Sequence, residues 1–259
     1  MTRFGHGAAT AIGRVRRVNE DSYLALPSLY VVADGMGGHG SGDVASALAI
    51  DALAACARVL PVTAEAVLAA LDDANQAIVG ATVRRGEVDG MGTTVTGLAL
   101  IETSGGSHLM VFNVGDSRVY RLAADRLDQI TVDHSEAQEL VVAGALTRDQ
   151  ARAYSRRNIV TRALGSDPAP TADHWLLPAI DGDRYLLCSD GLFSELTDDR
   201  IRELLATGDP QHAATTLVAA ADDAGGHDNI TVVVVDIDAD DDPVADGETT
   251  PRQMLPGRS

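Results

Sequence analysis

The short connections between strand-like segments constrain the fold of this chain more than any other feature of its sequence. Apolar runs rich in Val, Leu and Ile are bounded by Gly, Asp and Asn, a pattern typical of β-strands. The run 108–114 is separated from the run 117–122 by two residues. Parallel neighbours need a crossover of about a dozen residues or more, so the sequence predicts antiparallel strands. The expected strands are 29–33, 93–101, 108–114, 117–122, 185–188 and 230–237.

Four further segments combine helical periodicity with capping residues. Ser41 or Asp43 can cap a helix over 44–59, and Thr63 can cap a second helix that ends before Gly86. Thr197 can cap 198–206, and the segment 210–221 begins with Pro at a first-turn position. Together with antiparallel strands, these helices predict an α+β protein whose helices pack outside the sheet.

The charge balance excludes several kinds of partner. The 259 residues hold 20 basic side chains, all Arg, and 38 acidic ones, which gives a net charge of −18. Nucleic acids and anionic membranes select basic surfaces, so we expect neither as a partner. No stretch approaches the roughly 18 apolar residues that span a bilayer. Cys56 and Cys188 lie far apart in apolar segments, and we expect both to be reduced in a cytoplasmic protein.

The chain is expected to form one domain followed by a tail. Residues 1–237 alternate apolar runs and short turns, without a Pro- and Ser-rich linker or a repeat. Residues 238–259 are rich in Asp and lack apolar periodicity. We therefore expect 238–259 to be an acidic, disordered tail.

Four aspartates flank the apolar runs. Asp34 and Asp190 follow a run, whereas Asp116 and Asp228 precede one. In an antiparallel sheet the end of one strand lies beside the start of its neighbour, so all four carboxylates can meet at one edge. Asp is also a common turn residue, and each one alone can simply end a strand.

The segment 34–43, which begins with Asp34, is glycine-rich: five of its ten residues are Gly. Glycines allow backbone carbonyls to approach a bound species closely. The segment matches GxGxxG by spacing, but this match is weak because no parallel βαβ unit follows, and the chain has no Lys for a phosphate loop. Carboxylates with a backbone carbonyl make a hard-oxygen site that suits Mg²⁺ or Mn²⁺ rather than Zn²⁺.

Three arginines precede two acids in the segment 14–21. Arg14, Arg16 and Arg17 come just before Glu20 and Asp21. The simplest interpretation is that this segment is exposed, forms salt bridges and has no role in function. If the segment lies beside the acidic edge, one Arg can hold a phosphate bidentately while Glu20 or Asp21 joins a cation shell.

Eight segments in order resemble the metal-dependent serine/threonine protein phosphatases of type 2C, in their compact bacterial form. All lie within residues 5–237. The resemblance implies a β-sandwich of two antiparallel sheets flanked by helices, in four αββα layers, with a binuclear metal site at one end. The segments are 15–21, 33–39, 90–94, 113–118, 131–135, 161–165, 189–192 and 226–231.

The resemblance also implies a set of metal ligands. Asp34 corresponds to the carboxylate that bridges two Mn²⁺ or Mg²⁺ ions, and Asp190 and Asp228 complete one shell. The Gly35 carbonyl and Asp21 contribute to the other shell, largely through water, with Glu20 as a competing ligand. Asp116 corresponds to a ligand for a weaker third metal, shared with Asp190.

The remaining roles carried by the resemblance concern substrate binding and proton transfer. Arg16 matches the phosphate-binding Arg of the family, and residues 136–158 correspond to a variable flap. Where eukaryotic relatives have a His that protonates the leaving group, this chain has Met36, so His39 is a candidate general acid. Asp43, Asp133 and His134 are expected to have structural roles.

The sequence thus predicts a protein phosphatase that hydrolyses phosphoserine and phosphothreonine by in-line attack of a metal-bridging water, without a phosphoenzyme. It would act as a monomer on phosphorylated proteins, opposing serine/threonine kinases. Two alternatives are a phosphomonoesterase for small molecules and a pseudophosphatase that only binds phosphoproteins. The presence of all four aspartates argues against the second alternative.

Overall fold

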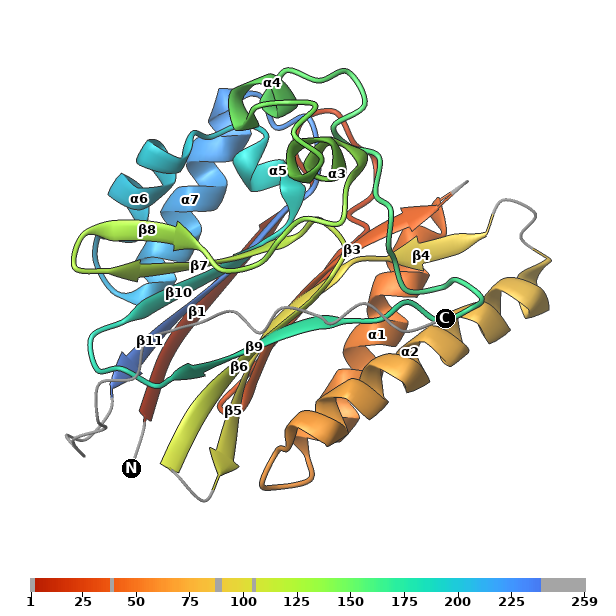
Figure 1. Cartoon of the computed structure of the whole chain (residues 1–259), viewed down its shortest axis with the longest axis horizontal. Helices are drawn as coiled ribbons and strands as arrows, with labels where there is room; N and C mark the ends of the chain where they lie inside the picture. Colours follow the sequence, from red (N-terminus) through yellow and green to blue (C-terminus); the bar gives the residue numbers. More distant parts are fainter. Residues whose placement is uncertain (1–2, 38–39, 87–89, 104–105, 239–259) are drawn as a thin grey trace.

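Two antiparallel β-sheets face each other in the computed structural model, which describes residues 3–37, 40–86, 90–103 and 106–238 (Figure 1). The first sheet has five strands. In spatial order they are β1 (Arg3–Ala11), β11 (Ile230–Asp238), β10 (Arg184–Cys188), β7 (Arg118–Ala123) and β8 (Arg126–Gln129).

The second sheet has six strands. Its short strand β4 (Met91–Thr93) pairs with the end of β3 and lies off the main order. The other five are, in spatial order, β2 (Asp21–Leu26), β3 (Leu29–Gly37), β5 (Val95–Thr103), β6 (Gly106–Val114) and β9 (Asp173–Pro178).

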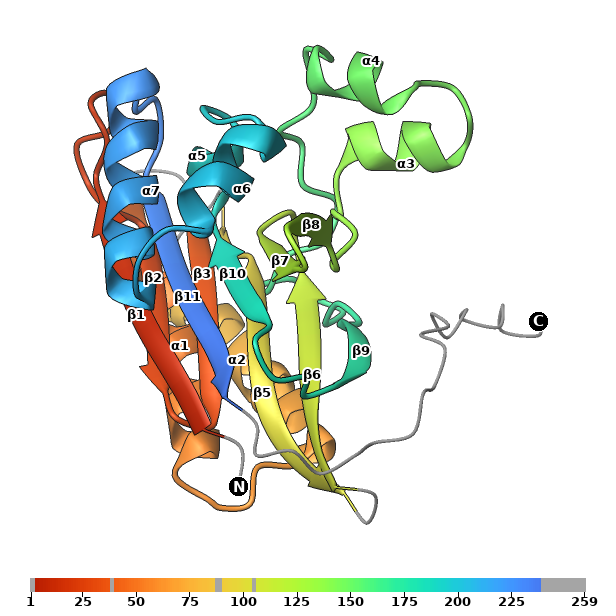
Figure 2. The ribbon, with the colours of Figure 1, turned by 90° about the vertical axis from the view of Figure 1, so that its left-hand side faces the viewer.

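Helices cover the outer face of each sheet. Helices α1 (Gly42–Ala57) and α2 (Ala64–Arg85) pack on the six-stranded sheet. On the five-stranded sheet lie α5 (Asp190–Phe193), α6 (Asp198–Leu205) and α7 (Pro210–Ala224). Two short helices, α3 (Glu136–Val142) and α4 (Arg148–Arg152), project away from the sandwich at one end (Figure 2).

Alternation along the strands divides the core into three layers. On β3, Val31 and Ala33 pack against α1 and α2, whereas Tyr30 and Val32 face the other sheet. All four side chains are buried, so both faces of this strand contribute apolar area. The resulting order of helices, sheet, sheet and helices confirms the predicted four-layer α+β sandwich.

The capping signals located the four longer helices. Thr63 accepts a hydrogen bond from the Ala66 N–H, and Gly86 ends α2 with φ +68°. Ser41 is the N-cap residue of α1 without a side-chain cap, and Asp43 lies in the first turn. Thr197 caps α6, and Asp209 caps α7.

One detail of the sequence interpretation was wrong. Residues 108–114 and 117–122 do not form a hairpin, because β6 belongs to the six-stranded sheet and β7 to the five-stranded one. Gly115, with φ +113°, turns the chain from one sheet to the other. The strands are antiparallel to their actual partners, so the fold class is unaffected.

The described part of the chain contains no helix with the length and apolar character needed to cross a membrane. Apart from Asp238, which ends β11, the expected tail 238–259 lies outside the described residues.

Candidate active site

A pocket of about 220 Å³ lies beside the end of β3, the start of α5 and the residues just before β11. The four aspartates flanking the strands all line it, together with Arg16 and Gly35. The sequence interpretation of a shared edge therefore agrees with the arrangement of the side chains. The residues that line the pocket are Arg16, Glu20, Asp34, Gly35, Met36, Gly37, Thr94, Asp116, Asn158, Val160, Asp190, Asp228 and Asn229.

Both sheets contribute to this pocket. Asp34 lies on β3, directly opposite Asp21 of β2 in the strand register. Asp190 is the first residue of α5, immediately after β10, and Asp228 precedes β11. Asp116 lies in the corner where the chain changes sheets. The two-sheet architecture therefore brings together carboxylates that are far apart in the sequence.

Gly35 lies where β3 runs closely past the start of α1. A Cβ atom at this position would lie 2.1 Å from the Gly42 carbonyl oxygen and 2.5 Å from that of Glu20. The Gly35 N–H donates to the Glu20 carbonyl over 3.2 Å. Any side chain at this position would separate the three segments that meet here.

Burial disfavours the charged form of the carboxyl groups and so raises their pKa values. It raises the pKa of Asp34 well above its ordinary value, and repulsion from Asp21 and Asp190 adds to the effect. Burial likewise raises the pKa of Asp21 to about 7, that of Asp190 to about 6 and that of Asp116 to about 8. A divalent cation between these groups would offset both the burial and the repulsion.

Arg16 brings a positive charge to the pocket wall. Its side chain is 49% exposed, and Nη2 donates to Asp228 Oδ2 over 2.6 Å. Arg14 instead pairs with Asp222 and Asp223 of α7. Arg17 is exposed and is not among the residues that line the pocket. The structure thus places one of the three arginines at the carboxylates.

Asn229 holds the loop that carries Arg16, and sequence reasoning assigned it no role. Its Nδ2 donates to the carbonyls of Ile12 (2.9 Å) and Val18 (3.0 Å), and its Oδ1 accepts from the Glu20 N–H (2.8 Å). The side chain therefore ties both ends of the loop 12–20 to the start of β11. The one sequence feature that could have pointed to Asn229 is its position directly after Asp228.

The sequence left Glu20 and Asp21 as alternative metal ligands, and the two residues occupy different places in the structure. Glu20 lines the pocket, and its Oε1 accepts from the Gly42 N–H over 3.0 Å. Asp21 is not part of the wall, and its Oδ2 accepts from Ser189 Oγ over 2.8 Å. Asp21 Oδ1 is buried and has no hydrogen-bond partner in the described structure.

The residues present fit divalent cations with hard-oxygen preferences. The wall supplies carboxylate oxygens and the Gly35 backbone. Asp21, which lies opposite Asp34 in the strand register, adds a buried oxygen without a hydrogen-bond partner. Within the described ranges, no group of three or more Asp, Glu, His or Cys side chains is arranged to hold a metal ion by itself, so other ligands, such as the Gly35 carbonyl and water, would have to complete a cation shell. Such a site suits Mg²⁺ or Mn²⁺, because these ions keep several water ligands.

The flap contributes to the pocket at its return to the sandwich. Asn158 and Val160 line the wall, a role for which the sequence gave no signal. The Tyr154 hydroxyl donates to Glu136 over 2.9 Å, and Arg152 pairs with Asp198 of α6 over 2.6 Å. The candidate general acid His39 lies outside the described residues.

Asp133 and His134 support the corner that carries Asp116. Asp133 accepts a fork of hydrogen bonds from Arg118, whose guanidinium lies 3.6 Å from the centre of the Phe193 ring. His134 Nδ1 accepts from the Gly115 N–H over 3.0 Å, and burial lowers the pKa of this ring. These contacts connect both residues to the segment 115–118.

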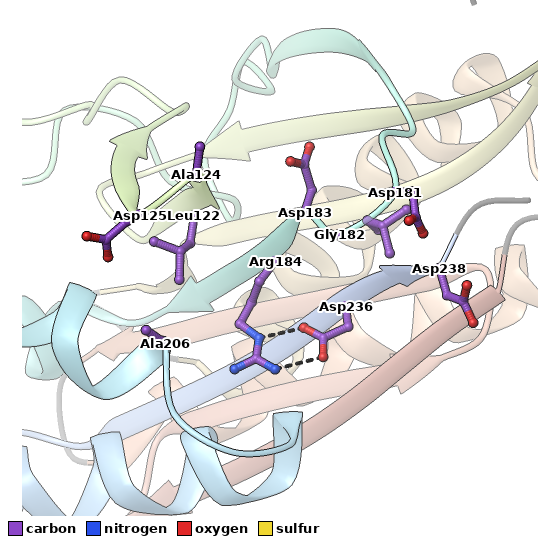
Figure 3. A pocket seen from close by; sticks show the side chains of 11 residues that line it. Leu122, Ala124, Asp125, Asp181, Gly182, Asp183, Arg184, Ala206, Asp236 and Asp238 are labelled. Atoms are coloured by element: carbon purple, nitrogen blue, oxygen red, sulfur yellow. Dashed lines mark hydrogen bonds and ion pairs between the residues drawn. The ribbon is translucent and has the colours of Figure 1, made fainter. Parts of the chain in front are cut away.

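A larger cavity of about 550 Å³ lies beside the start of β10 and the end of β11 (Figure 3). Two of its charged groups pair with each other, since Arg184 forms a fork with Asp236 (Figure 3). Asp183 accepts a hydrogen bond from Arg121, which is not one of the lining residues. None of its lining residues is one of the predicted site residues.

Comparison with known proteins identifies the family. The family model described as protein phosphatase 2C matches residues 15–222. Serine/threonine protein phosphatase PstP of Mycobacterium tuberculosis (strain ATCC 25618 / H37Rv) is 40% identical over 237 residues, which are 90% of this chain and 45% of PstP. Serine/threonine phosphatase stp of Listeria monocytogenes (strain ATCC BAA-679 / EGD-e) is 34% identical over 238 residues, 87% of this chain and 93% of stp.

The chain therefore spans about half the length of PstP and most of the length of stp. A crystal structure of the PstP catalytic domain in complex with two manganese ions matches with a TM-score of 0.82 and 37% identity. The match covers 92% of this chain and 100% of that one. The resemblance carried by the eight segments is thus confirmed, and the chain belongs to the protein phosphatase 2C family.

Proposed function

We propose that this chain is a metal-dependent phosphatase that hydrolyses phosphoserine and phosphothreonine in proteins. One observation carries the proposal: Arg16 and four carboxylates from two sheets line the same small pocket. The Arg16 guanidinium can bind two oxygens of a phosphate. The carboxylates supply oxygen ligands for the cations that would offset the phosphate charge. The names of PstP and stp, both serine/threonine phosphatases, support the same activity.

The proposed metal complement is two Mn²⁺ or Mg²⁺ ions, with a weaker third. Asp34 would be shared by the first two ions, Asp190 and Asp228 would complete one shell, and the Gly35 carbonyl the other. Glu20 is the better placed of the two acidic rivals for this second shell, since it lines the pocket. Asp116 and Asp190 would hold the third ion. The two manganese ions bound to the PstP catalytic domain support this stoichiometry.

Arg16 binds and orients the phosphate in this proposal. Its exposed guanidinium lies at the pocket wall beside Asp228, and its planar fork matches two phosphate oxygens. When bound, the cations supply a water whose lowered pKa makes hydroxide available near neutral pH.

No side chain needs to act as the nucleophile. Ser117 and Ser189 are fully buried and already hydrogen-bonded to Thr94 and Asp21. Cys188 is fully buried as well, and burial raises the pKa of its thiol. Hydrolysis therefore proceeds without a phosphoenzyme.

In the cell, the proposed substrates are phosphorylated proteins, among them serine/threonine kinases and their targets. We place the activity in residues 1–237, since the described strands and helices there build both walls of the pocket. The protein is proposed to act as a monomer. The cytoplasm is its proposed location, in keeping with its two free cysteines.

Phosphate release from a phosphothreonine peptide and from a small aryl phosphate, each with Mn²⁺ and with EDTA, tests the proposal. We expect release that requires Mn²⁺ and a higher kcat/KM for the peptide. Release in EDTA would contradict the metal dependence. Equal or higher efficiency on the aryl phosphate would instead favour a small-molecule phosphomonoesterase.

A further inference from the structure

Thr94 lies between β4 and β5, on the wall of the pocket. Its N–H donates to the Asp34 carbonyl over 2.9 Å, and its Oγ1 accepts from the Asp34 N–H over 3.1 Å. The neighbouring Thr93 hydroxyl also donates to the Asp34 carbonyl, over 2.9 Å. The backbone of Asp34 is thus held on both sides by two consecutive threonines.

The same Thr94 hydroxyl reaches the other sheet. Its Oγ1 lies 2.7 Å from Ser117 Oγ. Ser117 follows Asp116 directly and leads into β7 of the five-stranded sheet. One hydroxyl therefore joins the two chain segments that carry Asp34 and Asp116.

Water has no access to replace the hydrogen bond between Thr94 and Ser117. Thr94 is 1% exposed and Ser117 is fully buried. The corner packs directly on Thr94, because a Cβ at Gly115 would lie 2.6 Å from the Thr94 Cβ. Removal of the Thr94 hydroxyl would take away the bond to Ser117 Oγ and leave the Asp34 N–H without this acceptor in a closely packed region. Removal of the Ser117 hydroxyl would break the link between the two segments and leave Thr94 Oγ1 bonded to the Asp34 N–H.

We propose that Thr94 is a positioning residue whose hydroxyl sets the spacing between the Asp34 and Asp116 carboxylates for cation binding. The inference rests on the proposed function of these carboxylates as metal ligands. Groups that hold ligands from behind affect metal affinity through geometry, and their loss typically weakens binding about 10- to 100-fold.

Mn²⁺ binding to the full chain, measured by isothermal titration calorimetry, tests this role. Thr94→Val preserves the shape of the side chain and removes the hydroxyl, so we expect Mn²⁺ binding to weaken roughly 10- to 100-fold. Thr94→Ser retains the hydroxyl and should bind Mn²⁺ as the parent does. Thr96→Val is the matched control: Thr96 is a fully buried threonine of β5, with Oγ1 3.5 Å from the Phe112 carbonyl. It should also bind Mn²⁺ as the parent does.

Ser117→Ala removes the other half of the link and leaves the packing almost unchanged, so it serves even if Thr94→Val fails to fold. Because both hydroxyls act through one bond, the double variant should lose no more affinity than the weaker-binding single variant. Parent-like Mn²⁺ binding by folded Ser117→Ala, or additive losses in the double variant, would overturn the role of Thr94 alone. A parent chain that binds no Mn²⁺ would overturn the proposed function together with it.

Discussion

The carboxyl groups of Asp21, Asp34, Asp116 and Asp190 lie where their charges are least favourable. Burial is the largest cause of the raised pKa at each, and repulsion between neighbours follows. A protein that held these groups only for stability would gain from replacing them with apolar residues. Asp34, Asp116 and Asp190 share the pocket wall with Arg16, and the proposed cations would offset their charge.

These pKa values predict how cation binding depends on pH. With pKa values of about 6 for Asp190, 7 for Asp21 and 8 for Asp116, the site holds more protons at pH 6 than at pH 7.5. Over this range Asp190 and Asp21 lose most of their protons, whereas Asp116 keeps most of its own. Because Mn²⁺ must displace these protons, its affinity should rise from pH 6 to pH 7.5, with protons released on binding. Calorimetry at both pH values, in buffers of different ionisation enthalpy, measures both effects. Equal affinities without proton release would contradict the raised pKa values.

The junction of β2, β3 and α1 shows how secondary structure builds the site. The end of β3 passes so closely over the first turn of α1 and the Glu20 backbone that Gly35 has no room for a side chain. Serine hydroxyls complete the junction: Ser46 Oγ donates to the Glu20 carbonyl over 2.6 Å. Asp34 and Glu20 owe their places in the pocket to this close contact.

Gly35→Ala should separate these elements. The added methyl would meet backbone atoms, which cannot move aside as a flexible side chain can, so we expect a loss of about 1–3 kcal/mol in the free energy of unfolding. Urea unfolding in EDTA measures this loss without any contribution from bound cations. Gly37→Ala is the control, because a Cβ there would lie 3.4 Å from Met91, an ordinary contact. Equal stability of both variants and the parent would show that the junction is looser than described.

Local sequence signals located the helices better than the strands. Thr63 and Gly86 bound α2 as expected, because capping depends on a few neighbouring residues. Strand β1, in contrast, is poor in large apolar residues and pairs with β11 along its whole length. It also lies close under α7, where a Cβ at Gly7 would be 2.3 Å from the Gln211 backbone. Such a strand is defined by its partners, which a single-sequence pattern does not contain.

The whole sandwich determines which distant residues meet at the pocket. The positions of the four aspartates at the ends of apolar runs predicted a common edge, and the family resemblance predicted the architecture. The corner at Gly115, which moves the chain between sheets, was instead interpreted as a link between two antiparallel neighbours, because the length of a connection does not reveal which sheet comes next. Thr94, Asn158 and Asn229 were not assigned roles, since their contacts depend on that three-dimensional arrangement.

The most direct test of metal-dependent phosphatase activity is Mn²⁺-dependent phosphate release from a phosphothreonine peptide by the parent chain and by Asp34→Asn. Asp34 is the carboxylate proposed to be shared by two cations, so the variant should lose nearly all activity, while Asp72→Asn, an exposed change on α2, should retain it. Asn has nearly the size of Asp, and the raised pKa of Asp34 already favours its neutral form without cations, so loss of folding is not expected to explain the result. Thermal unfolding in EDTA verifies this. Parent-like phosphate release by Asp34→Asn would contradict the metal site on which the proposed function depends.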